Sequence, residues 1–387
     1  MYRYVIFHNI IAPYKTLLFN ELARRTGNGF LVAYLAETAG NRDWKVPKDE
    51  IAFPYEVLSA EREEDSNSLR MAVAAWRLLV RHDPGVVVVG GYNTLPYWAA
   101  VHWANRNRRK AVVIVESHFL DRPRTSLREA VKRLFVSRCD AALVDGTRHR
   151  DYIAGLGMGP EKIFIKYGTG PVDLSLYERE SGIVRPGKRE HCERLGLPER
   201  NFLYVGRFSP EKNILLLLEA YRRLREEDAR WGLILVGDGP QREEILRFVA
   251  DNHLSDVHLP GFRQKDELPF YYAISDLFVL PSRSEPWGLV AIEAMASGLP
   301  VLVSRNCGCY PDAVREGVNG HSFDPDSPDG LHSLMRAVVR GQIDLEAMGK
   351  ASLEIVRDFT AEKAGEMYLR AFRFVLPEGE VTGFGGS

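Results

Sequence analysis

Short apolar runs alternate with amphipathic stretches along the whole chain, which is the pattern of strands that alternate with helices. Residues 4–7, 30–35 and 86–89 are continuous apolar runs, and residues 69–81 between them have apolar side chains at helical spacing. A strand that is apolar at every position is buried on both faces, as in a parallel sheet covered by helices. Further strands are predicted at 111–116 and 141–144, and further helices at 16–25, 99–105 and 128–135.

The alternation stops between residues 178 and 200, where charged residues, glycine and proline cluster without an apolar run. This change of composition predicts a linker with a short helix, and we place a domain boundary near residue 182. The alternation then restarts and predicts a second parallel sheet. Its expected strands are 202–205, 232–236, 257–259, 277–280 and 301–303, and the expected helices are 214–226, 241–252, 266–274, 289–296, 310–316, 331–340 and 361–375.

A chain of 387 residues is long enough for two domains of roughly 100–200 residues each. Apolar residues make up 45% of the chain and charged residues 27%, which is average for folded domains and excludes a disordered or collagenous protein. No apolar run approaches the ~20 residues of a membrane-spanning helix. The N-terminal stretch, interrupted by His8, Asn9 and Pro13, predicts a first strand and not a signal peptide.

The charges nearly balance, with 51 basic and 52 acidic residues, whereas a nucleic-acid-binding protein usually has a strong basic excess. Residues 1–180 hold 26 basic and 21 acidic residues, so the first half is better suited to an anionic partner. Four cysteines, with only Cys307 and Cys309 close together, fit neither a disulfide framework nor a metal-ligand pattern. We therefore expect a reducing, cytoplasmic environment.

Two segments of the second half carry candidate chemistry. The first, residues 204–213 (YVGRFSPEKN), places Arg207 and Lys212 around a loop that follows a predicted strand. Two fixed cations at a strand end suit a diphosphate, because Arg binds two oxygens at once and Lys acts as a point charge. Taken alone, the segment fits a surface loop with two solvated cations better.

The second segment, residues 281–300, leads from a strand through a loop into a helix that begins near Gly288. Gly288 allows a ligand to approach the backbone, and the first N–H groups of the helix, at Leu289 and Val290, form an anion site. Glu285 and Glu293 suit the hydroxyls of a sugar and of a ribose. Glu293 would otherwise belong to a solvated helix face, but its apolar neighbours leave a charge that requires a partner.

Together, in this order and spacing, the two segments resemble the donor-site signature of the retaining glycosyltransferases of family 4. The resemblance rests on residues 206–213 and on EPWG, EAMA and GLPV within residues 285–301, with support from VGDGP at 236–240, Gly261-Phe262 and GVNG at 317–320. It implies the GT-B fold, an α/β architecture of two Rossmann-like parallel-sheet domains that face a central cleft, with the last helix returning to the first domain. The acceptor-side domain would be residues 1–181 with 361–376, the donor-binding domain 182–360, and the Gly-rich stretch 377–387 a flexible tail.

The resemblance implies transfer of a sugar from a nucleotide diphosphate sugar, with UDP favoured over GDP, to an acceptor hydroxyl. Arg207 and Lys212 would hold the diphosphate, Glu293 the ribose and Glu285 the transferred sugar. The nucleotide sugar is a co-substrate, and neither a metal nor another cofactor is expected. The implied donor contacts also include Gly206, Gly288, Leu289, Val290, Asp238, Gly239, Arg263 and Gln264.

In the first domain the candidates are fewer. His118 follows a predicted strand and matches the family's histidine near the transferred sugar, although a lone histidine is also a common structural residue. Residues 9–15 occupy the place of the family's first loop without the two glycines that many members carry there. Asn9, Pro13, Tyr14 and Lys15 are therefore expected on the acceptor side.

The family retains the anomeric configuration, and no carboxylate suited to a double displacement is apparent in this sequence. The expected route is therefore a front-side displacement, with charge stabilised by cations and a helix N-terminus and with domain closure that excludes water. A non-hydrolysing nucleotide-sugar epimerase of the same fold and a non-catalytic two-domain sugar-binding protein are the alternatives. A nicotinamide dehydrogenase is disfavoured because no G-x-G-x-x-G follows the first strand.

A basic, amphipathic stretch in the first half suggests a location at the inner face of a membrane. Leu127, Val131, Leu134, Phe135 and Val136 are interleaved with cations there, and residues 105–110 add more. Such a face suits an anionic membrane that carries a lipid-linked acceptor. The alternative is an ordinary helix with its apolar side in the core and a solvated outer face. The cations of the stretch are Arg122, Arg124, Arg128, Lys132, Arg133 and Arg138.

Overall fold

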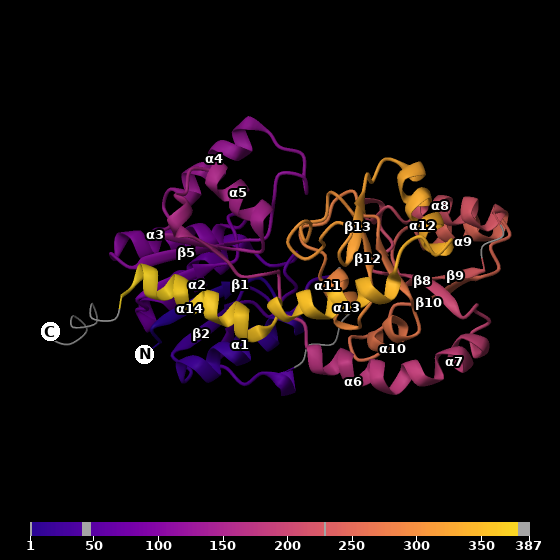
Figure 1. Cartoon of the computed structure of the whole chain (residues 1–387). Coiled ribbons are helices and arrows are strands. Elements are labelled where there is room, and N and C mark those ends of the chain that lie inside the picture. The colour runs from indigo at the N-terminus through magenta and orange to yellow at the C-terminus, as the bar shows by residue number, and fades with distance from the viewer. Residues whose placement is uncertain (1, 41–47, 228–229, 378–387) are drawn as a thin grey trace. The chain divides into compact units, whose positions relative to one another are not determined.

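The structure is a computed structural model that describes residues 2–40, 48–227 and 230–377 (Figure 1). It divides into two compact units, each with a parallel sheet covered by helices. The first unit takes the chain up to Phe119, Pro123–Pro171 and the chain from Ala361 onward, and the second takes Leu120–Arg122 and Val172–Thr360. The predicted α/β architecture of two Rossmann-like sheets is confirmed. The predicted tail lies, from residue 378 on, outside the described residues.

The first unit is built on seven parallel strands in the order β3-β2-β1-β4-β5-β6-β7. Every residue of β1, β2 and β4 is buried, which accounts for their uninterrupted apolar sequences. The sequence does not predict β3 and β7, because three-residue runs carry too little periodicity. The strands are β1 (Tyr4–His8), β2 (Phe30–Tyr34), β3 (Tyr55–Val57), β4 (Val86–Val89), β5 (Lys110–Val115), β6 (Ala141–Val144) and β7 (Ile163–Ile165).

Helices α1 (Pro13–Thr26) and α14 (Ala361–Val375) cover one face of this sheet, and α2 (Ser68–His82), α3 (Leu95–Arg106) and α5 (Thr147–Gly155) cover the other. The last helix, α14, packs on α1, β6 and β7, as its yellow ribbon shows in Figure 1. Its buried Phe372 stacks on Tyr4 with ring centroids 4.3 Å apart. The predicted return of the last helix to the first domain is confirmed.

The second unit has six parallel strands in the order β10-β9-β8-β11-β12-β13. A single apolar core extends over both faces of the sheet. The strands are β8 (Arg200–Val205), β9 (Trp231–Val236), β10 (Val257–Gly261), β11 (Leu277–Leu280), β12 (Val301–Ser304) and β13 (Gly320–Phe323), and the helices are α6 (Leu174–Val184), α7 (Lys188–Arg194), α8 (Ile214–Glu226), α9 (Arg242–Asp251), α10 (Leu268–Ala273), α11 (Leu289–Ala296), α12 (Pro328–Val339) and α13 (Leu345–Ile355).

Two details differ from the sequence-based expectation. Residues 178–200 form parts of α6 and α7 rather than a linker, and α6 packs on α10, so the units divide at residues 171 and 172 instead of near residue 182. The helix predicted at 310–316 is wrong, and this segment forms turns. The side chain of Asn319 accepts from Arg315 N (2.8 Å) and donates to Ala313 O (3.1 Å), which uses backbone groups that a helix would otherwise pair.

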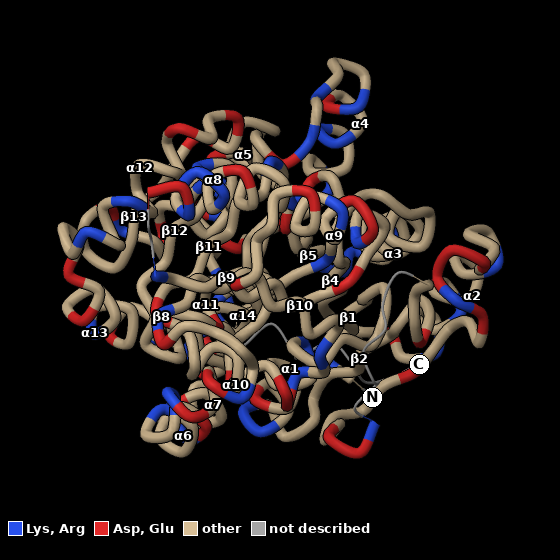
Figure 2. Tube along the Cα trace, turned by 90° about the vertical axis from the view of Figure 1, so that its right-hand side faces the viewer, with Lys and Arg blue, Asp and Glu red and all other residues tan. Residues whose placement is uncertain are grey.

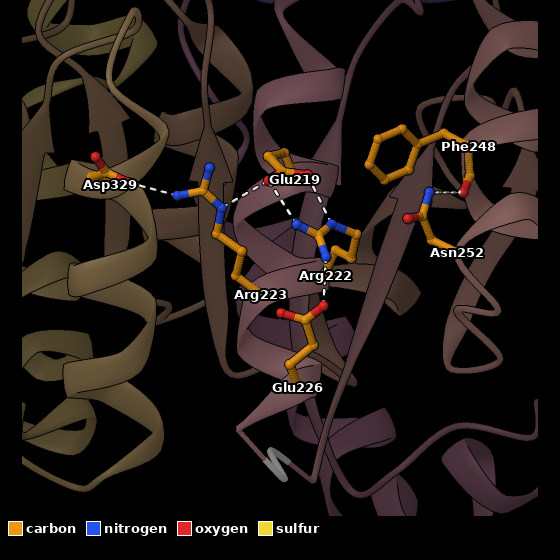
Figure 3. Close-up of polar contacts among 7 residues, drawn as sticks. All are labelled: Glu219, Arg222, Arg223, Glu226, Phe248, Asn252 and Asp329. Atoms are coloured by element: carbon orange, nitrogen blue, oxygen red, sulfur yellow. Dashed lines mark hydrogen bonds and ion pairs between the residues drawn. The ribbon is translucent and has the colours of Figure 1, made fainter.

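Helix α8 shows how the second unit separates its core from its surface. Leu217, Leu218 and Tyr221 are buried against the sheet, and the outer face carries ion pairs (Figure 3). Arg223 donates to Glu219 on its own helix and to Asp329 of α12. Exposed pairs of this kind contribute little stability, so the apolar face fixes the position of α8.

In both sheets the strand order reverses beside the first strand of the unit, between β1 and β4 and between β8 and β11. Ligands of such sheets bind outside the carboxyl ends of the strands at this switch point. The two candidate segments of the second half follow β8 and β11. They therefore meet at the one place in the second sheet where the fold favours a ligand.

Candidate functional site

Four loops are joined by backbone hydrogen bonds at the carboxyl edge of the second sheet, after β8, β9, β11 and β12. The loop after β11 donates from Arg283 N to the carbonyl of Glu211 in the loop after β8 (2.9 Å). Phe208 N donates to the carbonyl of Asp238 after β9 (2.8 Å), and Gly308 N after β12 donates to the carbonyl of Glu285 (3.0 Å). The backbones of these loops are therefore held in place relative to one another.

The loops after β8 and β9 approach so closely that a side chain has no room between them. Gly237 has φ = 147°, in the region that favours glycine, and a Cβ there would lie 1.9 Å from the carbonyl oxygen of Gly206. Glycine at this position thus allows the two strand ends to meet.

Lys212 and Glu285 form an ion pair across the loops after β8 and β11. The Nζ atom of Lys212 lies 2.6 Å from Oε2 of Glu285, and both side chains are mostly buried. Asn213 next to Lys212 reinforces the arrangement, since its side-chain amide donates to the carbonyls of Pro281 (3.2 Å) and Pro325 (2.7 Å). The structure thus brings together two residues that the sequence places 73 positions apart.

Arg207 lies at the same edge but is more exposed. Its guanidinium donates to Oε1 of Glu211 (3.1 Å), and 45% of its side chain is accessible to solvent. Burial alone would raise the pKa of Glu211, but hydrogen bonds from Ser209 and its own backbone, with Arg207 nearby, lower it. An exposed pair of this kind opens at little cost, so Arg207 can turn to a bound anion.

Helix α11 begins at this edge, directly after Gly288. Gly288 is buried and has φ = 104°, and a Cβ there would lie 3.0 Å from Leu280 and 3.3 Å from the sulfur of Cys309. The backbone N–H groups of the first turn, which include those of Leu289 and Val290, have no partner within the helix. With the positive end of the helix dipole, they favour an anion.

Glu293 lies one turn into α11 and interacts with two tyrosines. Tyr272 of α10 donates from its hydroxyl to Oε2 of Glu293 (2.9 Å). Burial raises the pKa of the Tyr177 hydroxyl on α6, and the nearby Glu293 raises the pKa of Tyr177 further. Burial raises the pKa of Glu293 to about 7, despite the hydrogen bond from Tyr272 that opposes this shift. Any additional hydrogen-bond donor would stabilise the ionised form of this buried carboxylate.

The remaining expected donor contacts surround this edge. Asp238 is exposed and accepts from Gly239 N (2.7 Å) in the loop after β9. Arg263 follows β10, donates to the carbonyl of Pro260 (3.0 Å) and lies over the ring of Tyr271. The backbone of Gln264 donates to Glu267 (2.8 Å). Strands β9 and β10 are neighbours, so these loops lie on one side of the switch point.

The first unit has a buried group of charges at the carboxyl ends of β5, β6 and β7. Lys15, in the first turn of α1, is fully buried with its Nζ 2.7 Å from Glu116 Oε1. Lys166 is also buried and pairs with the buried Asp145. Although burial alone would raise the pKa of Glu116, Lys15 and Lys166 lower it to about 2. Glu116 is the most accessible of the four, with 34% of its side chain exposed.

The other candidates of the first unit have mixed settings. His118 is fully buried, and its ring packs edge-on against His149 at 5.1 Å between centroids. Pro13 and Tyr14 begin α1 and are partly exposed, as is Asn9 after β1. Lys15 pairs with Glu116 within the unit instead of projecting into solvent. The expected contacts of His118 and of the first loop with a sugar or an acceptor stay predictions.

Sequence reasoning misses several residues that hold these groups. Tyr272 gives no local signal because it lies 21 positions from Glu293. Asn213 stands within the quoted segment, but its role depends on Pro325, 112 positions away. Glu116 is the last residue of a predicted strand, and a charge at a strand end close to His118 is a signal that could have been used.

The second unit also contains two buried cysteines and an open depression. Cys307 and Cys309 are buried, and the described part of the chain contains no cluster of three residues suited to a metal ion. An open depression of about 860 Å³ in the second unit is lined by Arg200, Asp276 and Pro300, among others. Arg200 begins β8, and Asp276 and Pro300 directly precede β11 and β12, so the depression lies at the opposite, amino edge of the sheet.

Comparisons with known proteins cover both halves of the chain. The family described as "Glycosyl transferases group 1" matches residues 189–354, and the "Glycosyl transferase 4-like domain" matches residues 11–168. The D-inositol 3-phosphate glycosyltransferase of Thermobifida fusca is 33% identical over 238 residues, 56% of this chain and 53% of that protein. An uncharacterized glycosyltransferase of Methanocaldococcus jannaschii is 30% identical over 199 residues, 51% of this chain and 54% of that protein. The chain thus spans about half the length of these curated relatives.

Among solved structures, HepE of Anabaena in complex with UDP superposes with a TM-score of 0.77. The superposition covers 96% of this chain and 99% of that chain at 17% sequence identity. A further crystal structure of HepE contains UDP-glucose. At this identity the likeness concerns the fold, and it agrees with the two sheets described above.

Replacing Gly237 by alanine should disrupt the joined loops. The new Cβ would meet the carbonyl of Gly206, and a backbone at this φ costs a non-glycine residue about 1–3 kcal/mol. We expect the Gly237→Ala protein to unfold at a lower denaturant concentration than the unchanged protein. Gly182→Ala is the control, because its Cβ meets nothing within 4 Å in α6 and should leave stability equal or higher. Equal midpoints for Gly237→Ala and the unchanged protein would contradict the packing described.

Proposed function

Because the chain belongs to the group 1 glycosyltransferases, we propose that it transfers a hexose from a nucleotide diphosphate sugar to an acceptor hydroxyl. The proposal rests on the carboxyl edge of the second sheet, where Lys212, Glu285 and the start of α11 lie together. UDP is the favoured nucleotide, since the fold neighbour HepE was crystallised with UDP and with UDP-glucose. The products would be glycans, glycolipids or glycosylated natural products.

The chemical problem in such a transfer is the negative charge that grows on the leaving diphosphate. Arg207 and Lys212 supply positive charge from one loop, and the N–H groups at the start of α11 supply it from the next. Fixed charges and dipoles of this kind need no reorganisation during the reaction, and each typically contributes a factor of about 10²–10³ in rate. This set provides the stabilisation without requiring a metal ion.

The Lys212–Glu285 pair explains how the pocket exchanges internal contacts for ligand contacts. Without a donor, each charge neutralises the other, which avoids the cost of burying either alone. A diphosphate next to Lys212 would compete for its ammonium, and sugar hydroxyls would donate to the carboxylate of Glu285. One internal pair is then replaced by two charge-assisted contacts to one ligand, which favours a molecule that carries phosphate and sugar together.

Glu293 is suited to the ribose of the nucleotide. Its carboxylate has a pKa of about 7 because of burial, and the two vicinal hydroxyls of a ribose are hydrogen-bond donors that favour the ionised form. Tyr272 donates to one of its oxygens and so orients the carboxylate. Arg263 and Gln264 would lie on the base side, next to Asp238 and Gly239.

We propose a retaining, front-side reaction. The bond between the anomeric carbon and the β-phosphate oxygen breaks, and the acceptor oxygen forms a bond to the anomeric carbon on the same face. The acceptor's proton moves to the departing phosphate, so that the products are the glycoside and the nucleoside diphosphate. His118 and Glu285 would contact the sugar, and Asn9, Pro13 and Tyr14 are assigned to the acceptor side. Lys15 is buried and paired with Glu116, so we assign no acceptor contact to it.

The ribose role of Glu293 predicts a pH dependence of donor affinity. If Glu293 binds the ribose as a carboxylate, it must lose its proton when the donor binds at a pH below its pKa of about 7 in the free protein. In that pH range the donor affinity falls tenfold for each unit by which the pH decreases. The Kd of UDP-glucose, whose diphosphate does not titrate near neutral pH, should rise roughly 30-fold from pH 8 to pH 5.5 by calorimetry. Glu293→Gln should bind more weakly at pH 8 and show a flat profile. A slope that persists in Glu293→Gln would refute the role.

The diphosphate role of Lys212 predicts a loss of turnover. Lys212→Met should lower kcat/KM for release of nucleoside diphosphate from a panel of UDP- and GDP-sugars by at least ~100-fold. Lys350→Met is the matched control, because Lys350 pairs with Glu346 on the exposed face of α13 and should turn over normally. Normal turnover in Lys212→Met would remove the assignment, and interconversion of two nucleotide sugars without release of the diphosphate would instead identify an epimerase.

A further inference from the structure

Helix α4 (Ser126–Val136) of the first unit presents its apolar side chains to solvent. Leu127 is 78% exposed, Val131 47% and Leu134 51%. At about 100° per residue these three fall on one narrow stripe, while Phe135 and Val136 point to the core. Figures 1 and 2 both show α4 projecting from its own unit. The alternative of an ordinary helix with its apolar side in the core does not describe this stripe.

Besides Phe135 and Val136, the inward side of α4 makes polar contacts that hold the helix in this orientation. Lys132 donates to the hydroxyl of Tyr152 (2.8 Å) and to Glu129 (2.7 Å), and Arg124 donates to the same hydroxyl (2.7 Å). Rotating the stripe inward would break these half-buried bonds and leave their groups without partners, which is costly. The exposed stripe is therefore built into the packing of the unit.

Cations border the stripe on both sides. On the helical wheel Arg128 and Arg133 fall to either side of Leu127, Val131 and Leu134, and both are exposed. Arg138 follows the end of the helix and is also exposed. The one acidic residue of α4, Glu129, is turned inward onto Lys132. The outward face of α4 thus combines apolar side chains with positive charge. Figure 2 marks in blue where Lys and Arg occur along the helix.

A second apolar surface of the first unit lies on α2 and α3. An open groove of about 440 Å³ is lined there by Leu69, Leu95 and Trp98, among others, and also by Arg138, which follows α4. Leu69 and Leu95 are themselves 68% and 49% exposed. An exposed apolar surface of this extent on a folded unit marks an interaction site.

We propose that the α4 stripe and the adjoining groove dock on the surface of an anionic lipid bilayer. An apolar stripe bordered by cations is the arrangement that inserts into the headgroup region while its charges meet anionic lipids. A second copy of the chain is a poorer partner, because a symmetric contact through α4 would bring the arginines of both copies together. No helix within the described residues is both long and apolar enough to cross a bilayer, so this docking is peripheral.

Co-sedimentation of the full chain with vesicles tests the proposal. We expect the protein to pellet with phosphatidylcholine vesicles that contain about one third phosphatidylglycerol. It should stay in the supernatant with phosphatidylcholine alone, and it should be released at about 0.5 M salt. Recovery in the supernatant with both kinds of vesicle would overturn the proposal.

Substitutions distinguish vesicle binding through the α4 stripe from nonspecific adsorption. A protein carrying Leu127→Ser, Val131→Ser and Leu134→Ser should lose at least tenfold in vesicle affinity. One with Arg128→Gln and Arg133→Gln should lose about fivefold per charge. Both should keep the thermal midpoint and the donor turnover of the unchanged protein, since these side chains are exposed. Ile183→Ser, at a 66% exposed site on α6, is the control and should bind vesicles normally.

Two further results would contradict the assignment. Unchanged vesicle binding by the triple serine variant would show that another surface binds the lipid. A dimer of the unchanged protein in light scattering that the triple variant abolishes, without vesicle binding by either, would assign the stripe to a second copy. Both readouts are independent of donor turnover, so they do not depend on the proposed glycosyl transfer.

Discussion

The reversal of strand order between β8 and β11 is the constraint on which the proposed site depends. Because these two strands are neighbours and both end at the same edge, the loop that carries Lys212 lies against the loop that carries Glu285. The backbone bond from Arg283 N to Glu211 O and the amide of Asn213 then hold the loops together. A different strand order would separate the cations from the start of α11, and neither group alone would form an anion site of this strength.

That arrangement also determines which charged side chains pair within the protein and which are accessible to a ligand. Lys212 and Glu285 are both mostly buried and satisfy each other, whereas Arg207 is exposed and held only by a solvated pair. In the first unit the charges of Lys15, Lys166 and Asp145 are almost completely buried. Glu116, which pairs with Lys15, is the most accessible member of this group. The chain thus has charge at the carboxyl edges of both sheets, and its most exposed cation there, Arg207, belongs to the second.

Much of the fold could be predicted from the sequence because parallel strands buried on both faces leave uninterrupted apolar runs, as in residues 86–89. The site segments could be identified because their chemistry lies within short stretches around Lys212 and Glu293. Strands β3, β7 and β13 are too short or too polar to show a period, and the turns at 310–316 depend on the side chain of Asn319. The contacts of Lys15 with Glu116 and of Glu293 with Tyr272 join distant positions, and one sequence contains no signal for such pairs. The outward stripe of α4 depends on the polar contacts of Lys132, which periodicity alone cannot reveal.

A crystal structure of the protein grown with uridine diphosphate would show where the nucleotide binds. We expect its diphosphate within hydrogen-bond distance of the backbone N–H groups at the start of α11 and of the Lys212 ammonium. We also expect the ribose hydroxyls to lie on the carboxylate of Glu293. A nucleotide bound elsewhere, with the Lys212–Glu285 pair intact and nothing seated above Gly288, would contradict the proposed donor site.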